Sequence, residues 1–467
     1  MANDVQALAQ AAETTDSGER RAEQAPISGV SAKSGRDVAL DPLRAGNALT
    51  IVCSVLPERK AELVALLTRI GTSIATSTEI VFDELRSVHF MRWVVIEGAA
   101  PGQRSQLAFE SNYDGTLAQH LDDLYEHGAR AMHAIYRCCA GYPFANAAEL
   151  SDDQLDAAQS FLLQNEVEYA AFYVGRRGKT MLQIRREARL RDGIQRFLDG
   201  LGSDPMRHFR GDPAAAYAAI VQHLKQSQGQ DFEALSEPAP TAPVRSIGSI
   251  VLRAVPFLPL VPLLPGLYAI LRRKENTDVP ESFDVVPAEQ ARLLAEREDF
   301  QVQNQLTHVV ALKPGPFRLL TAHIVLYGIT TLARFYFNQG NLGGLSTIHY
   351  ARWVLIDGGK RLLFFSNYDG SWERYLGDFI DQAHVGLTAV WSNTQGFPKT
   401  RNLVQEGATD EERFKAWTRA HQIPTQLWYS AYEQLTVSNI GRNSRICAGL
   451  VERPATREAL ERWLELL

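Results

Sequence analysis

The sequence predicts an α+β fold: two duplicated ferredoxin-like units, packed sheet to sheet as an intramolecular α+β barrel and joined by a proline-rich apolar linker. Two observations carry this prediction, a long internal duplication and an order of strand-like and helix-like patterns that recurs in each copy. A third, the length of 467 residues, allows at least two cores of ordinary size.

The duplication is found by sliding the chain against itself. VHFMRWVVIE at 88–97 matches IHYARWVLID at 348–357, and LAFESNYDG at 107–115 matches LLFFSNYDG at 362–370. Further matches pair Tyr173 with Tyr429 near the end of each copy. So many ordered matches exclude chance, and the copies cover roughly 48–200 and 305–456.

The elements of the first copy follow from periodicity and turn residues. The apolar, β-rich run from Thr50 to Leu56 predicts a strand that Pro57 ends. The patterns that follow predict, in order, a helix over 61–70, strands over 88–96 and 107–110, a helix from Asp114-Gly115 to about Arg137, a strand over 170–174 and a basic helix over 182–201. The resulting order β-α-β-β-α-β is that of a ferredoxin-like unit.

The chain divides into four predicted parts. Residues 1–46 form a disordered tail without aromatic residues, 47–235 the first repeat with a helical extension, 236–300 the apolar linker, and 301–467 the second repeat.

The linker contains the most unusual composition. Residues 254–271 carry no charge, and Pro256, Pro259, Pro262 and Pro265 recur at every third position. The run is long enough to span a membrane, but its prolines remove backbone donors and argue against a plain spanning helix. Two interpretations stay open: peripheral membrane contact through 253–274, with the flanking basic residues on anionic head groups, or a linker laid across a groove of the protein.

Composition excludes several functions. The net charge is −6, with 48 basic and 54 acidic side chains and no concentrated basic face, so we expect no nucleic-acid partner. The four cysteines lack zinc-site spacing and do not suggest a disulfide framework. No secretory signal is evident, which predicts a cytoplasmic location, with peripheral contact on the inner face of the membrane if the linker binds lipid.

Charged residues on the duplicated segments are the first candidates for chemistry. Arg92 and Arg352 lie in otherwise apolar strands, and a buried guanidinium needs an acceptor. The repeated Asp114 and Asp369 are the expected partners, at the turn before a helix. Two roles stay open for these aspartates: capping of the helix that follows, or ligand binding and catalysis.

Asymmetry between the copies selects histidines. His308 stands where the first copy has Ile51, and His384 stands opposite Ala129. His349 lies on the duplicated strand itself. Since an active site is needed only once, His308 and His384 are candidates for binding a cofactor, and His349 is a third candidate.

The repeated strand-strand-turn-helix unit ending in Ser-Asn-Tyr-Asp-Gly resembles the dimeric α+β barrel superfamily, including dye-decolourising peroxidases and chlorite dismutases. The second copy is similar to a bacterial family that is peroxidase-like by its fold. The resemblance implies a haem-dependent, peroxidase-like oxidoreductase. It assigns Asp114 or Asp369 to peroxide proton transfer, Arg92 or Arg352 to charge stabilisation, and His308, His349 or His384 to the haem iron. The family's turn reads Gly-x-x-Asp-Gly, whereas here Ser111 and Ser366 replace the first glycine.

A second function stays open. The chain can instead be a non-catalytic protein that binds a small or lipid-like hydrophobic molecule, or docks on a membrane, through the cleft between the sheets and the apolar segment 254–271.

Overall fold

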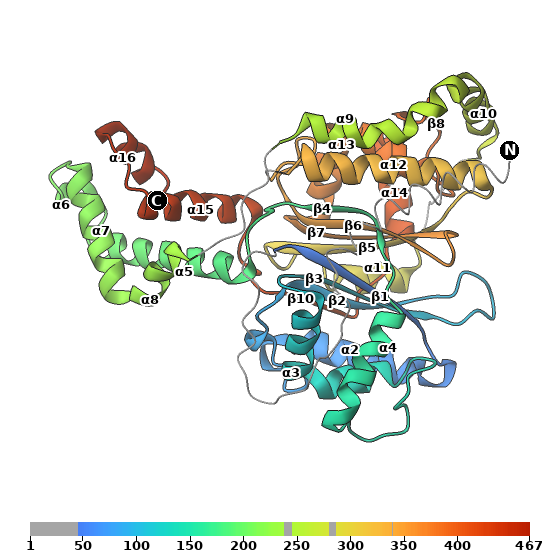
Figure 1. Cartoon of the computed structure of the whole chain (residues 1–467), viewed down its shortest axis with the longest axis horizontal. Helices are drawn as coiled ribbons and strands as arrows, with labels where there is room; N and C mark the ends of the chain where they lie inside the picture. Colours follow the sequence, from blue (N-terminus) through green and yellow to red (C-terminus); the bar gives the residue numbers. More distant parts are fainter. Residues whose placement is uncertain (1–44, 238–244, 280–285, 339) are drawn as a thin grey trace.

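The computed structural model describes residues 45–237, 245–279, 286–338 and 340–467 (Figure 1). The predicted disordered tail therefore lies almost entirely outside the described residues. The fold is mixed α+β: two antiparallel sheets lie one above the other, helices cover the outer face of each, and a helical arm extends to one side (Figure 1).

Each sheet has four strands. The first has the order β1-β3-β2-β10 and the second the order β4-β6-β7-β5. The strands are β1 (Asn47–Ser54), β2 (Val88–Ile96), β3 (Gln106–Tyr113), β4 (Tyr169–Val174), β5 (Gln303–Ala311), β6 (Ile348–Ile356), β7 (Arg361–Asp369) and β10 (Leu427–Ser430). A separate small hairpin joins β8 (Thr400–Arg401) to β9 (Gln405–Glu406).

The two repeats exchange a strand. β4 of the first repeat pairs with β6, and β10 of the second repeat pairs with β2. The segment that leads to each exchanged strand first contacts the sheet of its own repeat. The N–H of Val52 donates to the Asn165 carbonyl, and the N–H of Ile423 donates to the Thr307 carbonyl, both at 2.9 Å. Two self-contained ferredoxin-like units are therefore not observed, and the described strands form two separate sheets without barrel closure. The exchange covers edges of β2 and β6 that would otherwise be open.

The duplication is visible in detail. Both repeats have an irregularity at the same place, between Val88 and Phe90 and between Ile348 and Tyr350. Such a bulge changes the direction of the next side chain. Strict alternation predicts that His89 and Phe90 point to opposite sides of the sheet, yet both contact Tyr350 of the other repeat. That prediction is wrong because of the bulge.

Helices pack in three groups. The first sheet is covered by α2 (Lys60–Thr72), α3 (Leu117–Tyr136) and α4 (Leu155–Gln164), and the second by α12 (Pro316–Phe335), α13 (Trp372–Trp391) and α14 (Glu411–His421). The arm consists of α5 (Met181–Asp199), α6 (Pro205–His208), α7 (Pro213–Ser227), α8 (Gly229–Glu233), α15 (Val437–Val451) and α16 (Arg457–Leu464). It has its own apolar core, which includes Leu190, Ile220 and Ile446. The short helix α11 (Ala288–Ala295) precedes β5.

The proline-rich segment is helical. We call Ile247–Thr277 the strap; it contains α9 (Ile247–Ala254), a 3₁₀ helix (Val255–Leu263) and α10 (Leu264–Thr277). A 3₁₀ helix has three residues per turn, so prolines at every third position share one side and their missing donors are confined to it. The prolines thus exclude a continuous α-helix, as predicted, but not helical structure.

The strap lies along α12 and is fixed at both ends (Figure 1). At its start, Ser246 donates its N–H to the Phe335 carbonyl (3.0 Å), and the Phe257 and Tyr327 rings lie 5.3 Å apart. At its end, the buried Glu275 accepts the backbone N–H of Leu403 (2.7 Å). The strap is therefore held flat against the second half of the molecule.

Candidate functional site

The two predicted arginines lie between the sheets and share one carboxylate. Arg92 Nε is 2.5 Å from Glu110 Oε2, and Arg352 Nη2 is 3.4 Å from Glu110 Oε1. All three side chains are fully buried. Asp114 and Asp369, the predicted partners, do not contact either arginine; that prediction is wrong because the facing position on β3 already supplies Glu110.

Each arginine also reaches across to the opposite sheet. Arg92 donates to the Leu306 carbonyl (3.0 Å) and to Asn367 Oδ1 (2.6 Å). Arg352 makes the corresponding bonds to Leu49 (2.7 Å) and Asn112 (2.6 Å). Burial lowers the pKa of Arg352 to about 10, although the charge of Glu110 opposes this shift. The two guanidinium groups therefore join the sheets, and the inter-sheet space is filled with side chains rather than open as a cleft.

The repeated aspartates bind the arm. Asp114 Oδ2 accepts the N–H of Met181, the first residue of α5, at 2.7 Å, and Asp369 Oδ2 accepts the N–H of Val437, the first of α15, at 2.8 Å. The helices that directly follow the turns are capped instead by Thr116 and Ser371. Capping of the following helix, one of the two predicted roles, is thus replaced by capping of a helix far along the chain.

Each aspartate also accepts a hydrogen bond from a histidine. His89 Nε2 lies 2.8 Å from Asp114 Oδ1, and His349 Nε2 lies 2.7 Å from Asp369 Oδ1. Tyr432 lies between the imidazoles, and its hydroxyl is hydrogen-bonded to His89 Nδ1 at 2.9 Å. The result is a buried chain of hydrogen bonds that links Tyr432, His89 and Asp114. Burial raises the pKa of Tyr432 well above its ordinary value, so its hydroxyl stays protonated.

Sequence reasoning missed Glu110 and Tyr432. Glu110 stands where the second repeat has Phe365, and Tyr432 stands where the first has Arg176, so asymmetry between the copies was the available signal in both cases. The structure brings Asp114, Asp369 and His349 together at one end of the sheets, whereas His308 and His384 lie elsewhere.

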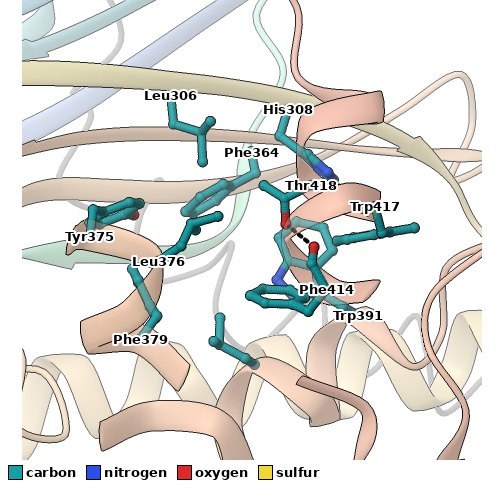
Figure 2. Close-up of a pocket in the computed structure, with 11 residues that line it drawn as sticks. Leu306, His308, Phe364, Tyr375, Leu376, Phe379, Trp391, Phe414, Trp417 and Thr418 are labelled. Atoms are coloured by element: carbon teal, nitrogen blue, oxygen red, sulfur yellow. Dashed lines mark hydrogen bonds between the residues drawn. The ribbon is translucent and has the colours of Figure 1, made fainter. Parts of the chain in front are cut away.

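His308 lies on β5 beside a small aromatic cavity (Figure 2). The lining comes from β5, β7, α13 and α14 and includes Phe364, Trp391, Trp417 and Phe414. Both ring nitrogens of His308 are buried and have no hydrogen-bond partner among the described residues. Burial, and secondarily the charge of His421, hold the pKa of His308 well below its ordinary value, so the imidazole is neutral.

The three predicted histidines do not fit a haem. The cavity beside His308 has a volume of about 20 Å³, which is room for about one water molecule. His349 is buried between Asp369 and Phe90, and His384, on α13, is bonded through Nδ1 to the Ile380 carbonyl (3.2 Å). Among the described residues no group of three or more His, Cys, Asp or Glu side chains could hold a metal ion. Haem binding stays a prediction of the sequence alone, and the packing around these histidines argues against it.

The strap presents a continuous apolar surface. Over half of the large apolar side chains that are exposed in the described part of the chain belong to it, including Leu252 (72% exposed), Leu258 (61%) and Val261 (53%). By length and composition both the strap and α12 are apolar enough to cross a membrane. A third of the most apolar stretch of α12 is buried, whereas none of the most apolar stretch of the strap is, so the strap is the side of the pair that faces outward.

Comparison with protein-family models, curated protein sequences and solved structures finds no match to this chain. The function is therefore inferred from the site geometry alone.

Glu110 is predicted to be essential for stability. In Glu110→Gln, two buried guanidinium groups lose the one carboxylate that pairs with them among the described residues, and we expect the free energy of unfolding to fall by about 3–5 kcal/mol. Denaturant titration measures the change. Glu97→Gln, which breaks the exposed Glu97–Lys60 pair, is the matched control and should cost less than about 1 kcal/mol. Equal losses in the two variants would contradict this role.

Two buried histidines predict acid sensitivity. Burial lowers the pKa of His120 to about 3 and that of His308 well below its ordinary value. Below about pH 6.5 the unfolded chain takes up these protons and the folded chain does not, so stability should fall by about 1 kcal/mol per pH unit for each histidine. Denaturant titration down to about pH 5 measures the slope. We expect His308→Leu to reduce it and the control His384→Leu to retain it; an unchanged slope in His308→Leu would refute the assignment.

The packing around the histidines predicts no haem. Protein purified from haem-supplemented cells should show no Soret band and no iron by elemental analysis. A Soret band that disappears in His308→Ala or His349→Ala would show that the chain opens a space the structure does not contain. It would support the peroxidase-like function that the resemblance to haem proteins predicts.

Proposed function

We propose that this chain is a peripheral membrane protein that docks on a lipid surface through the strap. The observation that carries the proposal is the outward apolar face of Ile247–Thr277, which no described part of the chain covers. Monomeric soluble proteins rarely expose so large a continuous apolar surface unless it binds a membrane or another molecule.

The geometry favours a strap lying in the membrane interface over one that spans the bilayer. Both ends are held to the same face of the protein, by Ser246 and by Glu275, and α12 runs alongside (Figure 1). Crossing the membrane would break these contacts and would place donor-poor prolines in hydrocarbon. Lying flat, the strap buries Leu258 and Val261 among acyl chains while the body stays in water.

Charge supports the same orientation. Arg272, Arg273 and Lys274 follow the apolar stretch directly, at the level that lipid head groups would occupy. Arg272 pairs with Glu275, whereas Arg273 is exposed. Basic residues at the edge of an apolar surface are attracted by anionic lipids, which are abundant in the cytoplasmic leaflet, so that face is the proposed location.

Vesicle binding tests the proposal. In Val261→Asp the strap loses apolar contact and gains a charge, and we expect binding to vesicles to weaken at least tenfold, which corresponds to about 1.4 kcal/mol. Co-sedimentation with vesicles measures the partition coefficient.

Val81→Asp is the matched control, because Val81 is also exposed (43%) but lies beside α3, on the far side of the molecule (Figure 1). It should bind like the wild type. Absence of vesicle binding by the wild type, or equal binding by both variants, would refute membrane docking. Self-association of the wild type that Val261→Asp abolishes would identify a second copy of the chain as the occupant instead.

A further inference from the structure

Arginine side chains gather where the strap begins. Arg334 lies in the last turn of α12, Arg245 lies two residues before α9, and Arg177 follows β4, which packs under α12. The guanidinium of Arg334 lies 5.7 Å from the centre of the Phe335 ring, and that of Arg245 lies 5.2 Å from the centre of the Tyr336 ring. These three residues are called the arginine cluster below.

The cluster has no carboxylate partner among the described residues. Arg245 and Arg334 are exposed and are held only by the aromatic rings beneath them. Arg177 is half-buried, and its Nε is fully buried without a hydrogen-bond partner. Burial lowers the pKa of Arg177; among its charged neighbours Arg334 lowers it further, and the opposing groups are tyrosines. A partly buried guanidinium whose Nε has no hydrogen-bond partner is costly, so an anion at this place would be stabilising.

Asymmetry between the repeats shows that the fold does not require these charges. The N–H of Gly175 donates to the His349 carbonyl (2.7 Å), and the N–H of Ala431 donates to the His89 carbonyl (2.9 Å), so the two connections occupy equivalent places. The first continues with Arg176-Arg177 and the second with Tyr432-Glu433. Only the connection beside the strap carries the arginine pair.

We propose that the arginine cluster binds the phosphate group of an anionic phospholipid. Guanidinium groups bind phosphate through paired, charge-assisted hydrogen bonds, and the cluster lies at the end of the surface that enters the lipid. This inference rests on the proposed membrane docking and adds the lipid class: the strap supplies apolar contact with any bilayer, and the cluster selects lipids with a negative head group.

The test compares two kinds of vesicle, one of phosphatidylcholine alone and one of phosphatidylcholine mixed with phosphatidylglycerol. We expect the wild type to prefer the mixed vesicles. The double variant Arg177→Gln/Arg334→Gln should bind them about 25-fold more weakly, about fivefold per arginine, with unchanged binding to phosphatidylcholine. Arg334→Gln alone, at an exposed helix end, should lose about fivefold and covers the case in which the double variant does not fold.

The control removes the same charge elsewhere. Arg69→Gln/Arg130→Gln changes two exposed arginines on α2 and α3 and should keep the wild-type preference. Equal losses in both double variants would mean that only net charge matters and would overturn the site. Wild-type binding without preference for the mixed vesicles would overturn the site alone, whereas no binding to either vesicle would refute docking itself.

A final experiment distinguishes a phospholipid from free phosphate as the ligand of the arginine cluster. Inorganic phosphate is titrated while the unfolding temperature of the wild type and of Arg177→Gln/Arg334→Gln is measured. Stabilisation of the wild type alone, together with equal binding of the two proteins to mixed vesicles, would show a site for free phosphate and would overturn the lipid assignment. Loss of vesicle preference in the double variant supports it.

Discussion

The architecture depends on one buried carboxylate. Glu110 lies between Arg92 and Arg352, and the two guanidinium groups extend from it to backbone carbonyls of opposite sheets. Charges buried this deeply are costly unless they are paired, and the bonds from both guanidinium groups to the opposite sheet therefore hold the two sheets at a fixed distance and register. The strand exchange ties the same two sheets together, because the segments before β4 and β10 contact one sheet and the strands themselves pair in the other.

The same end of the sheets positions the arm. Asp114 and Asp369 each accept one hydrogen bond from a histidine of their own repeat and one from the first turn of an arm helix. The repetition of the Asp-Gly turn in both copies is thus explained by a structural task that occurs twice. The hydrogen bonds that link Tyr432, His89 and Asp114 connect the second repeat to the first at this same end.

Much of the local structure could be predicted from the sequence. Alternation and turn residues located the strands over 88–96 and 170–174 nearly to the residue, because each strand is determined by its own side chains. The exchange could not be predicted, since β4 has an apolar pattern that suits either sheet edge. The direction of the His89 side chain is set by a bulge, and the alternation of residue types along the strand does not reveal that bulge.

The candidate site was predicted less well. Matching motifs directed attention to Asp114 and Asp369, whereas the residues that decide the electrostatics, Glu110 and Arg177, are those at which the repeats differ. Resemblance to haem proteins implied a cofactor, but an axial ligand needs space, and no sequence pattern reports whether the space beside a histidine is filled. The proline period in the strap did contain usable information, because three residues per turn is the 3₁₀ repeat.

Insertion of the strap into lipid is the central claim, and the depth of one side chain tests it directly. The native cysteines are all buried, so a spin label attached to Leu258→Cys reports on that position alone, with Val81→Cys as its control. On addition of vesicles, the account predicts that the label at 258 becomes shielded from a water-soluble nickel chelate and more accessible to oxygen, while the label at 81 does not change. A label at 258 that stays equally accessible to the chelate with and without vesicles would contradict it.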